Sequence, residues 1–145
     1  MEFKSLDDEN IAEIEARCTN GADAQFSGEI ESGGIYRLSV ALSDISFGGE
    51  KYNESFLASL REKLKAAENA RFVIAPAAEK PLSSVDDALE MTAAFKHCAR
   101  RIKDCENVVG FEIPGAFSGL ERAGNLEKNF AEELAEKHPQ YVFYK

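Results

Sequence analysis

Three acidic residues, Asp44, Glu79 and Glu112, lie within or just after short apolar segments that are typical of buried β-strands. In a parallel sheet, ligand-binding and catalytic groups gather at the carboxyl ends of the strands, in the loops that lead into helices. These carboxylates are therefore candidates for general acid–base catalysis or for ligand binding. The structural alternative for each is a solvated loop acid, because the chain contains 26 acidic residues.

Two charged residues stand inside apolar segments. Glu112 is flanked by Phe111 and Ile113, and Arg37 lies within the run IYRLSVAL. A charge in such a strand needs a partner, or its pKa shifts toward the neutral form. We therefore predict that Arg37 and Glu112 meet at one end of the sheet, as a structural ion pair or as part of an active site. The candidate ligand-facing residues are thus Arg37, Asp44, Glu79 and Glu112.

The glycine pairs, histidines and cysteines of the chain lack the spacing of a known phosphate-binding or metal-binding motif. Gly33-Gly34 precedes an apolar segment, and Gly48-Gly49 lacks the spacing of a phosphate-binding loop. The two histidines are isolated, and the three cysteines have no CxxC spacing, which argues against a zinc site and a disulfide framework. These residues are His97, His138, Cys18, Cys98 and Cys105. We predict no metal, no cofactor and no catalytic residue.

Apolar patterning places the candidates on repeated strand–helix units. β-Branched and apolar runs predict strands at 35–42, 71–75, 107–113 and 140–144. Apolar stripes at helical spacing predict helices at 54–69, 84–104 and 126–137. From residue 35 the order is therefore β-α-β-α-β-α-β, which implies parallel strands joined by right-handed crossovers.

The first third of the chain has a weaker pattern. Ser5 and the acids after it, with Ile11, Ile14 and Cys18 on one face, predict a helix over 5–18. Residues 19–34 are expected to form a loop with a short strand near 24–30, and a hairpin between that strand and the next is the alternative.

These elements together predict one α/β domain over residues 1–145. Its sheet is mainly parallel, with four to five strands, and is either a partial or half barrel or an open doubly wound sheet. A half barrel exposes two sheet edges, which proteins normally pair or cover. Self-association through the sheet edges, as a homodimer, is therefore one hypothesis for a partner.

The charge of the chain limits which other classes of partner we expect. The net charge is −9, and residues 1–50 hold eleven acids against three bases. Such a surface repels nucleic acid and anionic lipid headgroups, so we predict neither partner. The sequence has no apolar run near the ~20 residues of a membrane-spanning helix, and its acidic first twenty residues are unlike a signal peptide. We expect a cytoplasmic protein or a fragment of a larger secreted chain.

Three stretches share a pattern with a known enzyme fold: GGIYRLSVALSD, FLASLREKLKAAENARFVIAP and FKHCARRIKDCENVVGFEI. In these stretches the chain resembles the second to fourth strands of the (β/α)8 barrel of cellulase-like glycoside hydrolases. The resemblance covers about residues 33–114, with Arg37 at the family's matching arginine. It implies a truncated barrel that retains affinity for carbohydrate.

The chain departs from that family at the catalytic positions. The family's fourth strand ends in Asn-Glu-Pro, whose Glu is the acid/base, whereas Glu112-Ile113-Pro114 stands here. The second catalytic Glu belongs to a later strand of the family, and a complete barrel needs about 250 residues. A retaining mechanism requires two carboxyl groups about 5 Å apart. No such pair can be assigned, so we do not expect an enzyme.

Three classes of function remain. The first is a non-catalytic truncated barrel that binds carbohydrate, which exposed aromatic rings at Phe47, Tyr52 and Phe117 would favour. The second is an interaction or structural module without a small ligand, which self-association would favour. The third is an open α/β domain that binds a small molecule or nucleotide, which a helix N-terminus open to an anion would favour.

Overall fold

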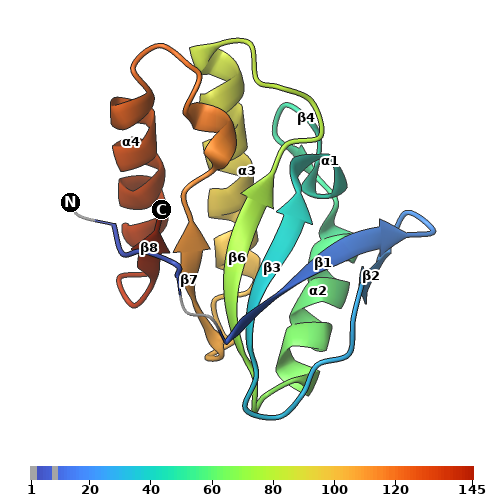
Figure 1. Ribbon diagram of the computed structural model, residues 1–145. Helices are drawn as coiled ribbons and strands as arrows, with labels where there is room; N and C mark the ends of the chain where they lie inside the picture. The colour runs from blue at the N-terminus through green and yellow to red at the C-terminus, as the bar shows by residue number, and fades with distance from the viewer. Residues whose placement is uncertain (1–2, 8–9) are drawn as a thin grey trace.

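The computed structural model describes residues 3–7 and 10–145 and contains one six-stranded sheet in the order β2-β1-β3-β6-β7-β8 (Figure 1). Its strands are β1 (Ile11–Thr19), β2 (Asp23–Phe26), β3 (Ile35–Ala41), β6 (Arg71–Ala77), β7 (Val108–Glu112) and β8 (Val142–Tyr144). All neighbouring strands pair in parallel except β1 and β2, which are antiparallel. The protein is therefore α/β with a mainly parallel sheet.

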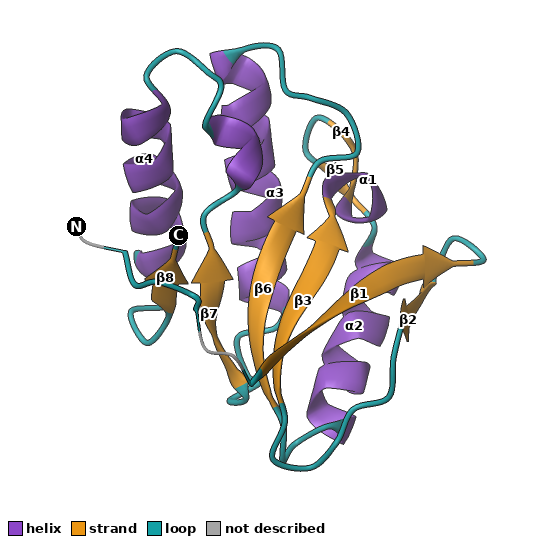
Figure 2. Ribbon diagram, in the orientation of Figure 1, coloured by secondary structure: helices purple, strands orange, loops and turns teal. Residues whose placement is uncertain are grey.

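The three long helices cover one face of this sheet (Figure 2). They are α2 (Glu54–Ala66), α3 (Val85–Arg101) and α4 (Ala123–Ala135). Since the parallel strands follow chain order, right-handed crossovers put every helix on the same side. A doubly wound sheet has helices on both faces, whereas the parallel strands of this open sheet follow chain order and its long helices lie on one side. We call the uncovered side of the sheet the open face.

Short elements complete the fold at the carboxyl ends of the strands. They are α1 (Leu42–Ile45), the hairpin of β4 (Ser46–Gly48) and β5 (Lys51–Tyr52), and the 3-10 helix η1 (Gly115–Phe117). The strands and helices predicted from residue 35 onward are confirmed. The main sheet has six strands, more than the four to five expected, because the N-terminal third contributes two of them. No described helix is long and apolar enough to cross a bilayer.

The helix predicted over 5–18 is wrong in the part that the structure describes, because β1 occupies Ile11–Thr19. Within β1, Ile14 and Ala16 are buried while Glu13 and Glu15 are exposed, which is the two-residue period of a strand. Ile11, Ile14 and Cys18 also fit the spacing of a helix, so the sequence pattern of this segment is ambiguous. Parallel pairing with β3 along residues 11–16 decides in favour of the strand.

A hairpin does form in the N-terminal third, but β2 pairs with β1 and not with β3. The turn between them contains Asn20 and Gly21, whose φ angles of 53° and 73° are both positive. The amide of Ala22 closes the turn by donating to the Thr19 carbonyl at 3.1 Å. An Asn-Gly pair in this geometry is a strong hairpin signal, and it is the signal that the helix interpretation overlooked.

Both edges of the sheet carry hydrogen bonds from other segments of the chain. At the β8 edge, the Lys4 amide donates to the Phe143 carbonyl at 3.0 Å, and the Lys145 amide donates to the Lys4 carbonyl at 2.8 Å. At the β2 edge, the Ala24 amide donates to Ser59 Oγ of α2 at 2.9 Å. Self-association through these edges stays a prediction.

Candidate functional site

The predicted pairing of Arg37 with Glu112 is confirmed. Arg37 Nε lies 2.6 Å from Glu112 Oε2, and Arg37 Nη2 lies 2.8 Å from Glu112 Oε1, so the two groups meet through two parallel hydrogen bonds. Glu13 of β1 adds a third contact, with its Oε1 3.1 Å from Arg37 Nη1. The hydrogen bonding that Arg37 donates to Glu112 is the main cause of the raised pKa of Arg37. We refer to Glu13, Arg37 and Glu112 as the open-face cluster.

An irregularity in β7 aims Glu112 at the open face. Phe72 of β6 is in register with Val108, but Val73 is in register with Gly110, so β7 contains an extra residue at this point. The shift lets Val108 and Phe111, three residues apart, both be buried in the core. Glu112 follows Phe111 and therefore points to the opposite side, where Arg37 lies.

Gly110 is required at the same place by its contact with β8. A Cβ atom on this residue would lie 1.8 Å from the carbonyl oxygen of Val142. Any side chain would therefore push β8 away from β7. The backbone at Gly110 thus supports both the strand pairing and the direction of Glu112.

The open-face cluster has a structural role that its position explains. Val73 and Ala75 of β6 alternate with the core residues Phe72 and Ile74, so they face away from the helices. They are nevertheless only 2% and 1% exposed. Arg37 and Glu112 come from the strands on either side of β6, and their contact spans it. The pair contributes to this cover, because the arginine stem covers apolar surface. The N-terminal segment also lies beside Val73, where Ser5 and Leu6 line a pocket with it.

Asp44 and Glu79, the other two predicted residues, meet at a second arginine. Arg17 Nε lies 3.1 Å from Asp44 Oδ2, and Arg17 Nη2 lies 2.6 Å from Glu79 Oε1. Asp44 also accepts from the Cys18 amide at 3.1 Å, which ties α1 to β1. The charge of Asp44 is the main cause of the raised pKa of Arg17. We call these three residues the carboxyl-end cluster.

Arg17 is a residue that the sequence analysis missed, because it was assigned to a helix. Its side chain follows Glu13 and Glu15 in the exposed alternation of β1. Once β1 is recognised as a parallel neighbour of β3, residue 17 necessarily lies at the carboxyl end of the sheet. The alternation of polar and apolar residues in β1 was the sequence signal that could have placed Arg17.

A cavity of about 470 Å³ opens beside the carboxyl-end cluster, between the loops that follow β3 and β6. This volume lies within the range of small-molecule sites. Its apolar wall is formed by Leu42, Ala78, Pro81 and Leu82. Its polar lining is formed by Ser43, Ser46, Glu79, Lys80, Asp87 and Glu90. Of the residues predicted to face a ligand, only Glu79 lines it directly.

Helix α3 provides one polar side of the cavity. Ser84 caps the helix by accepting from the Asp87 amide at 3.2 Å. The Asp87 carboxylate in turn accepts from the amide and hydroxyl of Ser83, both at 2.9 Å. These hydrogen bonds lower the pKa of Asp87, with the Ser83 amide as the largest cause. The helix start is thereby fixed, and Asp87 is held as an anion.

The β4–β5 hairpin provides the rim. Its turn contains Gly48 and Gly49, with φ angles of 103° and 59°. The Gly49 amide donates to Glu90 Oε1 of α3 at 3.0 Å, which anchors the turn beside the cavity. Phe47 lies between the lining residues Ser46 and Gly48, and its side chain is 66% exposed. A large aromatic side chain is therefore exposed on the hairpin whose other residues line the cavity.

The other two aromatic residues proposed as indicators behave differently. Phe117 is fully buried and packs against Phe130, with ring centroids 6.0 Å apart. Tyr52 stacks on His97 at a centroid distance of 4.2 Å and an interplanar angle of 15°. His97 also contacts the Glu54 carboxylate at 3.0 Å. Of the three rings, Phe47 is the one free to meet a ligand.

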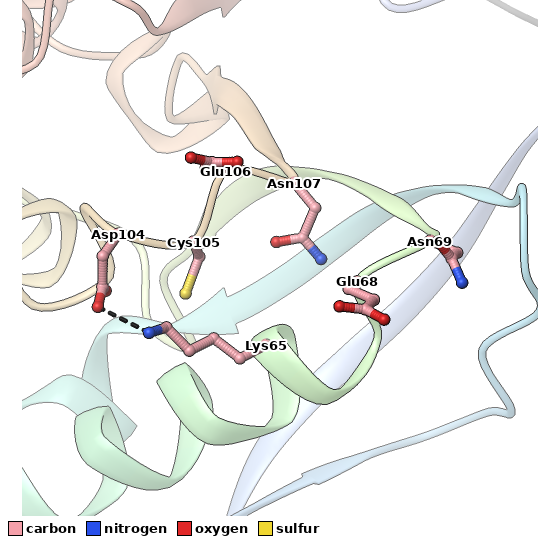
Figure 3. A pocket seen from close by; sticks show the side chains of 7 residues that line it. All are labelled: Lys65, Glu68, Asn69, Asp104, Cys105, Glu106 and Asn107. Atoms are coloured by element: carbon pink, nitrogen blue, oxygen red, sulfur yellow. Dashed lines mark ion pairs between the residues drawn. The ribbon is translucent and has the colours of Figure 1, made fainter.

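A second pocket, of about 400 Å³, lies at the amino ends of the strands (Figure 3). Three of its polar side chains, Lys65, Asp104 and Asn107, bond to neighbouring protein groups. Asn107 Nδ2 donates to the carbonyls of Leu64 and Ala67 at the end of α2, both at 2.9 Å. Asp104 accepts from Arg61 and lies 2.9 Å from Lys65 Nζ, and these bonds hold its pKa well below the usual range. We therefore interpret this pocket as structural, because these bonds hold the end of α2 against the segment before β7.

No protein-family model, curated protein or solved structure matches the chain. The resemblance to cellulase-like barrels stays a prediction. Within the part of the chain that the structure describes, no three His, Cys, Asp or Glu side chains gather as a metal site would require.

Proposed function

We propose that this protein is a non-catalytic carbohydrate-binding domain. The observation that carries the proposal is the cavity at the carboxyl ends of β3 and β6. The β4–β5 hairpin, which contributes Ser46 and Gly48 to the lining, also exposes Phe47. Ligands of parallel sheets bind at this end of the strands. The cavity is the place where loop side chains can contact a ligand without disturbing the sheet.

The lining suits a polyhydroxylated ligand. Sugar hydroxyls both donate and accept, and the hydroxyls of Ser43 and Ser46 do the same. The carboxylates of Glu79 and Glu90 accept strongly from hydroxyl donors. The apolar face of a sugar ring can pack on Phe47, which contributes through burial of apolar surface. The site thus offers polar groups for the hydroxyls of a sugar and an aromatic ring for its apolar face.

Anionic ligands such as nucleotides fit this end of the sheet poorly. The N-terminus of α2 is capped by Asn53, whose Oδ1 accepts from the Phe56 amide at 3.2 Å, and Ser84 caps α3. Glu54 stands in the first turn of α2, and Asp86 and Asp87 stand in that of α3. A phosphate would have to displace a cap and approach these acids.

Catalysis by the predicted acids is not supported by their partners. Both oxygens of Glu112 accept from Arg37, and Glu79 is bonded to Arg17. Carboxylate oxygens that already accept hydrogen bonds from an arginine are less available to a reacting group. The proposal is therefore limited to binding.

The test is titration calorimetry of the protein with neutral oligosaccharides, such as cello-, xylo- and mannooligosaccharides. Phe47→Ala should weaken binding about tenfold or more, since covering half of an aromatic side chain contributes on the order of 2 kcal/mol. Leu89→Ala is the control, because Leu89 is another exposed large apolar residue but belongs to α3 and not to the β4–β5 hairpin. Equal effects of the two variants, or binding of nucleotides in place of sugars, would contradict the proposal.

A further inference from the structure

We infer that the cavity between the N-terminal segment and the open face binds a zwitterionic amino acid with an apolar side chain. The volume of this open-face cavity is about 280 Å³. Sites for drug-sized ligands measure about 300 Å³ or more, so a ligand here must be small. The cavity lies near the amino ends of β3 and β6, whereas the proposed sugar site lies at their carboxyl ends. The inference therefore does not depend on the proposed function.

The sheet forms the floor of the open-face cavity. Ile11, Ile35 and Arg71, the first residues of β1, β3 and β6, are in register with one another, and Val73 follows on the same face of β6. Burial of an apolar ligand group against such side chains is favourable. The apolar groups that line the cavity are the side chains of Leu6, Ile11, Ile35, Val73 and Val109 and the ring of Tyr144.

The N-terminal segment forms the roof. Lys4 is bonded to the edge of β8 by two backbone hydrogen bonds, and residues 5–7 line the cavity. Figure 1 shows this segment running from the β8 edge toward β7. A ligand in the cavity would therefore contact the sheet on one side and this segment on the other, and small-molecule sites bury most of a ligand's surface in this way.

Asp7 and Arg71 bring opposite charges to the cavity without neutralising each other. Asp7 belongs to the roof and Arg71 to the floor. In the described part of the chain, neither side chain has a hydrogen-bond or ion-pair partner. Arg17, Arg37 and Arg61, in contrast, are each bonded to a carboxylate. Arg71 is thus available to a ligand carboxylate, which a guanidinium can hold through two parallel hydrogen bonds, and Asp7 is available to an ammonium group.

A zwitterion matches this arrangement better than an ion of one sign. An anion attracted by Arg71 would be repelled by Asp7, and a cation attracted by Asp7 would be repelled by Arg71. An amino acid carries a carboxylate and an ammonium group on one carbon atom, so it can satisfy both residues. Its apolar side chain can then pack on the apolar lining of the cavity, which selects residues such as leucine over polar ones.

The experiment compares leucine with three relatives that each lack one feature. Glycine lacks the apolar side chain, leucinamide lacks the carboxylate and N-acetylleucine lacks the ammonium group. Each compound is titrated at mildly acidic pH into isotopically labelled protein, and the amide NMR signals give both the affinity and the location. Leucine should bind about tenfold or more tightly than glycine. It should bind about three- to tenfold more tightly than leucinamide and N-acetylleucine, because Asp7 and Arg71 are exposed and their charges are screened.

Two substitutions separate the two charges. Arg71→Gln should abolish the preference for leucine over leucinamide and keep the preference over N-acetylleucine, and Asp7→Asn should do the reverse. The controls are Arg100→Gln and Glu121→Gln, equal charge changes at exposed residues that do not line the cavity. Both controls should keep both preferences. All four positions are exposed, so the variants should retain the fold.

The expected result also has a location, since leucine should shift the amide signals of Val73 and Val109. Shifts centred on Ser43 and Ser46 instead would place the ligand in the carboxyl-end cavity and would overturn the inference. Equal affinity for leucine, leucinamide and N-acetylleucine would overturn it, as would the same losses in the control variants. Absence of leucine binding would overturn it too and would leave the carbohydrate function, which is tested separately with oligosaccharides, unaffected.

Discussion

Arg37 and Arg17 each join two carboxylates on the sheet, but their surroundings differ. In the open-face cluster, the side chains of Arg37 and Glu112 are 31% and 21% exposed, and their contact spans β6. In the carboxyl-end cluster, the side chains of Arg17 and Glu79 are 50% and 48% exposed, beside a cavity. The same kind of ion pair therefore spans a strand of the sheet in one place and borders a cavity in the other.

The difference arises from what lies under each cluster. Beneath the contact of Arg37 and Glu112 are the small side chains of a central strand, which need cover because no helix packs on that face. Arg17 and Glu79 lie where strands give way to loops, so their removal exposes little apolar surface. Burial, more than the type of ion pair, sets the effect that we expect from substitution.

The largest effect is expected from Gly110→Ala, which would disturb the strand that presents Glu112. The new Cβ would lie 1.8 Å from the Val142 carbonyl oxygen, so β8 would have to move. We expect a loss of about 3 kcal/mol or more in the free energy of unfolding, measured by urea denaturation. Gly119→Ala is the control, since its Cβ would meet no atom within 4 Å. Equal stability of the two variants would show that β7 and β8 are not in this close contact.

Arg37→Ala should have the next largest effect. Removing the guanidinium leaves Glu112 without its two hydrogen bonds and uncovers part of β6. Since both side chains are partly exposed, we expect a loss of about 2–3 kcal/mol, below the range for a fully buried pair. The double variant Arg37→Leu with Glu112→Leu should recover part of the loss. An unchanged denaturation midpoint in Arg37→Ala would mean that the open-face cluster contributes nothing to the fold.

The smallest effect on stability is expected from Arg17→Ala. An ion pair that is half exposed contributes less than about 1 kcal/mol, so the denaturation midpoint should change little. Glu79 would lose its anchor at the cavity, and affinity for the sugar should therefore fall. Denaturation and calorimetry of the same variant test both expectations. A large loss of stability would remove the distinction between the two clusters.

The candidate site was partly predictable, for reasons that particular residues illustrate. Arg37 and Glu112 were paired from sequence because each is an isolated charge in an apolar strand, and burial demands compensation. Asp44 and Glu79 were placed at one edge because consecutive parallel strands present their carboxyl ends together. The places of Arg17 and Glu90 depend on contacts between distant segments, which no local pattern contains.

The sequence by itself determined the strand–helix alternation from residue 35, because apolar periodicity is a local property that burial enforces along each element. It also determined that charges inside strands need partners. Only the tertiary structure decided that residues 11–19 form a strand, since pairing with β3 overrode an ambiguous periodicity. It alone also decided which face of β7 carries Glu112, because the extra residue in that strand is defined only by its register with β6.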